Sequence, residues 1–138
     1  INKKFLENVL IDAKDLFREN YHNSKIMHIL ICRYLVNGDY HSSYNDKFKG
    51  DYLCIEFQFK YISNNYIFII DKILEKYQIK ITGFMDGKYI KNNFSDNKID
   101  FTEMVYKIQN GFNENEVRLI PKNYKNVGFF EKFFQLFS

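Results

Sequence analysis

The sequence predicts an α+β fold in which helices pack on one face of a mostly antiparallel sheet. Segments with apolar residues at helical spacing alternate with segments whose apolar residues recur at every second position. Two of the strand-like segments follow one another without a helix between them, which favours antiparallel pairing. With 138 residues, of which 46% are hydrophobic, the chain has the size and composition of one domain with a buried core.

The first half of the chain is expected to hold a helix, two strands and a second helix. Apolar residues near the N-terminus recur at helical spacing and predict an amphipathic helix of about four turns. A strand that is apolar on both sides is expected at residues 26–36, and a half-exposed strand with regular alternation at residues 52–60. Residues 37–51 form a polar loop that is longer than a simple hairpin requires. Ser63 is suited to cap the second helix.

A tight turn is expected after the second helix. Residues 78–85 predict a strand, and Asp86-Gly87 is typical of a type I′ turn, in which both central residues have positive φ. Residues 88–90 would then form the returning strand.

Capping residues delimit a short helix near the end of the domain. Asp100 and Glu103 resemble a capping box at its start, and Gly111 is suited to the position just after its end. A short edge strand then leads to Pro121, so we assign residues 1–121 to a single α+β domain.

Charge and composition argue against several functional classes. The net charge is +3, with 20 Lys and Arg interspersed among 17 Asp and Glu, so charge alone does not predict nucleic-acid binding. No apolar stretch could span a bilayer and no signal peptide is apparent, so we expect a cytoplasmic protein. The many Phe and Tyr residues are typical of an AT-rich coding bias and are not taken as a functional signal. Because the sequence begins with Ile1 rather than Met, it is expected to be a fragment of a longer chain.

No motif that encodes catalytic geometry is present. The six glycines are too scattered for a phosphate-binding loop, and no Cys-x-x-Cys occurs. The histidines His22, His28 and His41 lack a metal-binding spacing, and His28 is interpreted as a strand-edge residue. Cys32 could pair with His28 as nucleophile and base, but a buried core cysteine is the favoured interpretation. We therefore expect no enzyme activity, no metal site and no cofactor.

The C-terminal segment is the most unusual part of the sequence. Residues 122–138 combine a polar linker with an amphipathic helix whose phenylalanines share one face. These residues are Phe129, Phe130, Phe133, Phe134 and Phe137. The helix either packs on the domain's own sheet or binds a membrane surface or a partner's groove.

Spaced residues in the N-terminal half follow the pattern of a known family. The first predicted helix ends in Ala-Lys, and the next strand has His28 between apolar residues. An aromatic residue at Tyr34, a glycine at Gly50 and an apolar strand from Leu53 follow without a gap. In this order, residues 1–83 are similar to the insertion subdomain of FtsA, the bacterial actin-like cell-division protein.

The resemblance implies a role in assembly. FtsA proteins bind ATP in an actin-like core, attach to the membrane by a C-terminal amphipathic helix, and contact neighbouring subunits and division proteins through the insertion subdomain. Residues 128–134 look like the membrane-targeting helix, whereas none of the nucleotide-binding segments is present, so no ATP site is carried over. The chain differs from the family at Ile31, where Pro is usual, and over residues 41–48, where the family has a Gly-Pro-rich loop.

We therefore expect a non-enzymatic protein-interaction domain, in the manner of a cell-division assembly module, with a protein partner or self-association and with peripheral membrane contact through the C-terminal helix. The residues expected to contact the partner in and after the polar loop are Tyr40, Tyr44, Phe48 and Tyr52. The alternative is a structural or RNA-binding subunit of a large assembly such as a ribosome. Its base-stacking residues would be Tyr52, Tyr61 and Tyr66. A small enzyme with scattered site residues is a third hypothesis.

Overall fold

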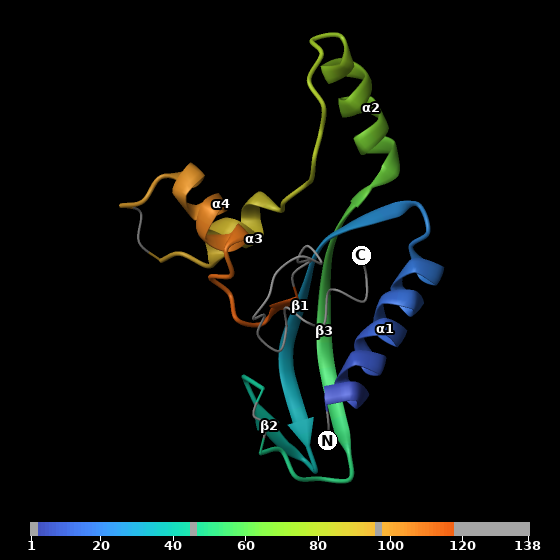
Figure 1. Ribbon diagram of the computed structural model, residues 1–138, viewed down its shortest axis with the longest axis vertical. Coiled ribbons are helices and arrows are strands. Elements are labelled where there is room, and N and C mark those ends of the chain that lie inside the picture. Colours follow the sequence, from blue (N-terminus) through green and yellow to red (C-terminus); the bar gives the residue numbers. More distant parts are fainter. Residues whose placement is uncertain (1–2, 45–46, 96–97, 118–138) are drawn as a thin grey trace.

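The computed structural model describes residues 3–44, 47–95 and 98–117. Its elements are, in chain order, α1 (Lys3–Asn20), β1 (Ser24–Val36), β2 (Asp39–His41), β3 (Leu53–Ser63), α2 (Asn64–Glu75), α3 (Gly87–Asn92), α4 (Phe101–Gln109) and β4 (Glu116–Val117) (Figure 1). The strands form one antiparallel sheet, so the predicted α+β class is confirmed.

β1 is the central strand of this sheet. β3 pairs with β1 along one edge over the whole length of both strands. β2 and β4 share the other edge, with β2 beside the C-terminal end of β1 and β4 beside Ile29 and Leu30. Among the described residues, no strand lies beside the outer edge of β3.

Two irregularities in β1 decide which layer its side chains face. The pairing with β3 skips Met27 and Cys32, so each is an extra residue in β1. Because an extra residue reverses the alternation of side chains, Tyr34 lies on the same face as Ile29. The regular alternation expected from the sequence would have placed Tyr34 on the opposite face. Cys32, expected in the core, is exposed.

Two groups of buried side chains lie on opposite faces of β1. On one face α1 packs against the sheet, and the buried residues are Leu6, Leu10, Ile29, Ile31, Tyr34 and Val117. On the other face α3 and α4 pack against β1, and the buried residues are Leu30, Tyr89, Ile90, Met104 and Ile108. The predicted packing of helices on one face therefore holds for α1, whereas α3 and α4 meet the opposite face.

A tight hairpin connects β1 to β2. Asn37 and Gly38 form its turn with φ values of 49° and 97°, the positive values that a type I′ turn requires. The Asn37 Oδ1 accepts hydrogen bonds from the backbone N–H groups of Asp51 and Tyr52, each at 3.2 Å. The turn is thereby fastened to the start of β3. The polar loop expected over residues 37–51 thus begins with a hairpin.

The hairpin predicted at Asp86 and Gly87 is wrong. Residues 78–85 form no strand, and residues 88–90 belong to α3 instead of a returning strand. Asp86 is the N-cap of α3, with φ at −82°, and its Oδ1 accepts a hydrogen bond from the Tyr89 N–H at 2.8 Å. An aspartate side chain serves a helix N-cap as well as it serves a turn.

The other predicted helix caps are confirmed. The Ser63 Oγ accepts a hydrogen bond from the Asn65 N–H at 3.2 Å at the start of α2. The Asp100 Oδ1 accepts one from the Glu103 N–H at 2.8 Å at the start of α4. Gly111 follows the last turn of α4 with φ at 88°, a value that glycine adopts without strain.

Gly50 is expected to tolerate no side chain, because it packs against the β1–β2 turn. A Cβ at Gly50 would lie 2.8 Å from both Asn37 Nδ2 and Val36 Cγ1, so Gly50→Ala must displace these two side chains, one of which holds the turn to β3. We expect the free energy of unfolding, measured by urea denaturation, to fall by about 1–3 kcal/mol. Gly83→Ala is the control, since a Cβ there meets no atom within 4 Å. An equal loss in both variants would contradict the prediction.

Candidate interaction surface

α2 presents an apolar surface to solvent along its length. None of its 12 residues is buried. Its large apolar side chains with exposed fractions between 38% and 65% are Tyr66, Phe68, Ile69, Ile70 and Ile73. Tyr77 and Ile79, just after the helix, are 72% and 53% exposed. A helix of a globular protein normally turns its apolar face to the core, so α2 lacks a covering layer in the part of the chain that the structure describes.

α2 projects beyond the end of the sheet. Figure 1 shows it in green at the opposite end of the molecule from β2, apart from α3 and α4. It is held at its base, where Ser63 caps its first turn and the Asn64 N–H donates to the carbonyl oxygen of Asn23 at 2.8 Å. The chain leaves α2 through Gln78, whose φ is 57°. A helix fixed at one end in this way is accessible to another protein from several sides.

Apart from Phe68, the apolar residues of α2 form one broad face; Phe68 lies on the opposite side of the helix, where Lys72 contacts its ring. With about 3.6 residues per turn, the centre of this face is a line of four residues. They are Tyr66, Ile70, Ile73 and Tyr77. Further apolar residues, Ile67, Leu74 and Ile69, flank the line. The charged residues lie on the other side of the helix, and the two acidic ones balance the two basic ones: Asp71, Glu75, Lys72 and Lys76.

The residues predicted to make protein contacts around the polar loop fall into two groups. Tyr40 in β2 and Tyr52 just before β3 are 66% and 79% exposed. Tyr44 and Phe48 are half-buried instead, with ring centroids 6.1 Å and 5.8 Å from that of Tyr34 in the core. The structure therefore brings Tyr44 and Phe48 together at the edge of the core and leaves the other two at the surface. Binding at these residues stays a prediction.

Of the tyrosines considered for stacking on RNA bases, Tyr52 and Tyr66 lie far apart, and Tyr61 makes contacts within the domain. Tyr52 and Tyr66 lie just beyond opposite ends of the 11-residue β3, which spans about 35 Å. Tyr61 contacts the rings of Phe17 and Tyr21, with centroid distances of 5.2 Å and 5.0 Å. The phenylalanines predicted to bind a membrane or a partner lie outside the described residues: Phe129, Phe130, Phe133, Phe134 and Phe137.

His28 joins the central strand to its neighbours through a buried polar network. It was expected at a strand edge, but its exposed fraction is 4%. Its Nε2 accepts a hydrogen bond from the Asp86 N–H at 2.9 Å. The proton of the neutral ring is therefore on Nδ1, which donates to the Glu116 Oε1 at 2.6 Å. Both ring nitrogens are thus engaged inside the protein, which suits a structural role better than that of a catalytic base.

Tyr89 completes this network from α3. Its hydroxyl donates to the Glu116 Oε2 at 2.7 Å and accepts a hydrogen bond from the Asn113 Nδ2 at 3.1 Å. Burial, and after it the bond to Glu116, raises the pKa of Tyr89 above that of an ordinary tyrosine. The network therefore ties β1, β4 and α3 together as one unit.

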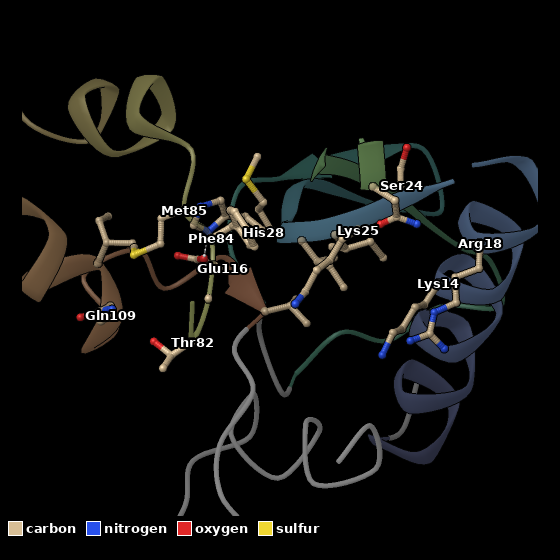
Figure 2. A pocket seen from close by; sticks show the side chains of 17 residues that line it. Lys14, Arg18, Ser24, Lys25, His28, Thr82, Phe84, Met85, Gln109 and Glu116 are labelled. Carbon is tan, nitrogen blue, oxygen red and sulfur yellow. Dashed lines mark hydrogen bonds and ion pairs between the residues drawn. The ribbon is translucent and has the colours of Figure 1, made fainter. Parts of the chain in front are cut away.

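A basic cavity of about 870 Å³ opens between α1 and the segment that precedes α3 (Figure 2). Lys14 and Arg18 of α1 point into it, and Lys25 of β1 borders it. Burial, and after it the neighbouring Arg18, lowers the pKa of Lys14. Glu116 and Val117 of β4 line the cavity on the side away from α1.

Comparison with known proteins identifies no family for this chain. The chain matches no protein-family model, no curated protein and no solved structure. The resemblance to FtsA therefore stays a prediction. Within residues 3–117, apart from the short gaps, no cluster of three His, Cys, Asp or Glu could hold a metal ion. No helix in the same part of the chain has the length and apolar composition needed to cross a bilayer.

Proposed function

We propose that this chain is a protein-interaction domain that binds its partner protein through α2. The observation that supports this function is a helix of 12 residues without a buried side chain, whose large exposed side chains are apolar. Apart from Phe68, these side chains and Tyr77 lie on one face and leave on the order of 400–500 Å² of apolar surface in water. A patch of this size is near the upper end of what monomeric proteins expose, and such patches are often functional. Covering this surface would stabilise a complex through the hydrophobic effect.

The partner is expected to offer an uncharged apolar groove. The charged residues of α2 balance one another and lie away from the apolar line, so the contact face itself carries no charge. Helices that lie on anionic lipid, by contrast, have an excess of Lys and Arg on the polar face. The apolar face of α2 is also wider than the narrow seam of a two-stranded coiled coil. A helix of this kind is suited to lie in a groove.

This function agrees with the assembly role that the resemblance to FtsA implies. In a division-type assembly, α2 would make the main protein contact, and the exposed rings of Tyr40 and Tyr52 would add a second. The Phe-rich helix predicted at the C-terminus would supply the membrane contact. No step of this function requires a cofactor or a catalytic group.

Photo-crosslinking from α2 tests the proposed function. Benzoylphenylalanine replaces Tyr66 in α2, which is 65% exposed, or Tyr106 in α4, which is 66% exposed and serves as the matched control. In cells that naturally produce the protein, irradiation is expected to link the Tyr66 variant to one discrete protein and to leave the control without that adduct. Adding Ile70→Asp and Ile73→Asp to the Tyr66 variant should abolish the adduct. The same adduct from both positions, or none from either, would contradict the proposal.

A lipid surface is the competing occupant of α2, and vesicle flotation distinguishes it. The full chain and its Ile70→Asp/Ile73→Asp variant are mixed with vesicles of neutral and anionic phospholipids. We expect both proteins to float to the same extent, because any lipid contact would be made elsewhere in the chain. Flotation that depends on Ile70 and Ile73 would assign α2 to the membrane and overturn the proposal of a protein partner.

A further inference from the structure

β3 presents a long outer edge in the part of the chain that the structure describes. β3 has 11 residues without proline or bulge, and in the described chain it pairs only with β1. An edge strand exposes unpaired N–H and C=O groups to which another strand can pair, and natural proteins usually shorten, bend or cover such edges or place charged side chains on them. β3 is not shortened, and a second copy can match each of its charged side chains, Glu56 and Lys60, with the opposite charge, so its edge is suited to receive the same strand.

The side chains of β3 are complementary to those of a second, antiparallel copy of β3. Its exposed face has Glu56, Gln58 and Lys60 in alternation. If two copies pair around a twofold axis at Gln58, Glu56 of each copy lies opposite Lys60 of the other. Shifting the axis to Glu56 or to Lys60 would place like charges opposite each other, which is unfavourable. One register therefore creates two ion pairs, and Gln58 marks its centre.

The opposite face of β3 fits the same register. Phe57 and Phe59 face α1, and both are half-buried. With the axis at Gln58, Phe57 of one copy lies opposite Phe59 of the other, twice in the dimer. Aromatic pairs across adjacent strands stabilise a sheet. Both faces of β3 thus favour the pairing that the charges select.

α1 provides apolar surface beside this edge. Phe17 of α1 stacks on Phe59 of β3 with ring centroids 4.6 Å apart, so α1 lies over β3. Lys14 and Arg18 point into the cavity that β4 borders, and β4 lies along the edge of β1 opposite β3 (Figure 2). Leu16 lies about 200° from both around the helix and is 59% exposed. It therefore faces the side of the β3 edge, where a second copy would cover it.

We propose that two copies of this chain associate through the outer edges of β3, antiparallel and centred on Gln58, into one continuous sheet. The interface is isologous, because each copy contributes the same strand and the same flank of α1. Main-chain hydrogen bonds between the two edges supply the affinity, as in other cases of strand addition. In each copy the Arg33 Nε binds the Glu56 Oε2. The other carboxylate oxygen of Glu56 can then accept a hydrogen bond from Lys60 of the second copy. The residues that pair in this dimer all belong to β3, so the pairing does not use the apolar face of α2.

A disulfide at the twofold axis tests the register. In the full chain with Cys32→Ser and Cys54→Ser, Gln58→Cys places two thiols opposite each other, with Cα atoms about 4.5–5.5 Å apart, within the range of a disulfide. Mild oxidation is expected to give a covalent dimer. The matched control keeps Cys54 on the same face, with Cys32→Ser, and should stay uncrosslinked because Cys54 would lie opposite Ile62. Equal crosslinking of both proteins, or none in the Gln58→Cys protein, would overturn the proposal.

A change of charge provides the second measurement. Lys60→Glu places like charges opposite each other twice and is expected to raise the dimer dissociation constant about tenfold or more. Lys72→Glu on α2 makes the same change of charge away from the edge and should leave that constant unchanged. Light scattering over a concentration series measures both. A chain that stays monomeric throughout, or equal effects of the two variants, would contradict the β3 interface while leaving the α2 proposal standing.

Discussion

Replacing Glu116 with alanine is expected to lower the free energy of unfolding by about 3 kcal/mol. Glu116 is 7% exposed, and its two oxygens accept hydrogen bonds from His28 at 2.6 Å and from the Tyr89 hydroxyl at 2.7 Å. Without the carboxylate, both donors stay buried and lose their acceptor. Each such donor costs on the order of 1–3 kcal/mol. The variant also loses the side-chain bridge that links β4 to α3.

Two further variants identify the network as the cause. Glu114→Ala makes the same change two residues away at an exposed position and should alter stability by less than about 0.5 kcal/mol. The loss of unfolding free energy in Glu116→Gln should fall between those of the two alanine variants. Its amide oxygen still accepts a hydrogen bond from His28, but its amide nitrogen cannot accept one from Tyr89. Urea denaturation followed by circular dichroism measures all three. Equal losses at positions 114 and 116 would show that the buried network contributes little.

The two Asx-Gly pairs show what local sequence can and cannot predict. Both Asn37-Gly38 and Asp86-Gly87 are suited to a type I′ turn, yet only the first forms one. Asp86 is instead fixed by partners far along the chain, since its N–H donates to His28, 58 residues away. Its side chain then caps α3, and residues 88–90 become helical. The local preference for a turn is therefore overridden by a part-buried hydrogen bond, which contributes about 1 kcal/mol.

Helices and strands were predictable where the local pattern agrees with the tertiary environment. The stripe of α1, the caps at Ser63 and Asp100, and the alternation in β3 are all local signals. The extra residues in β1 are not, because a bulge depends on how the partner strand pairs. The network of His28 and Glu116 joins residues 88 apart and leaves no motif in the sequence.

The candidate surface on α2 was only half predictable. The stripe of apolar residues along α2 and its N-cap were evident in the sequence. The stripe by itself, however, indicates only which face of the helix is apolar. Whether another part of the chain covers that face depends on the direction in which α2 leaves the end of β3. An available signal was the width of the apolar face, since Ile67 and Leu74 extend it beyond the stripe that a single core contact needs.

A matched pair of isoleucines tests whether α2 is uncovered in the isolated protein. Ile108 in α4 is 2% exposed, within the cluster around Leu30, whereas Ile73 in α2 is 51% exposed. Ile108→Ala removes buried methyl groups and leaves a cavity, so we expect the free energy of unfolding to fall by about 3 kcal/mol. Ile73→Ala should change it by less than about 0.5 kcal/mol, because the side chain is largely in water in both states.

The comparison is balanced because both residues lie near the C-terminal end of a helix, where the exchange of Ile for Ala changes helix propensity equally. The difference between the two losses therefore reports burial. Urea denaturation at low protein concentration keeps association from contributing to either value. If Ile73→Ala also cost about 3 kcal/mol, α2 would be covered within the isolated chain. The observation that supports the proposed function would then be lost.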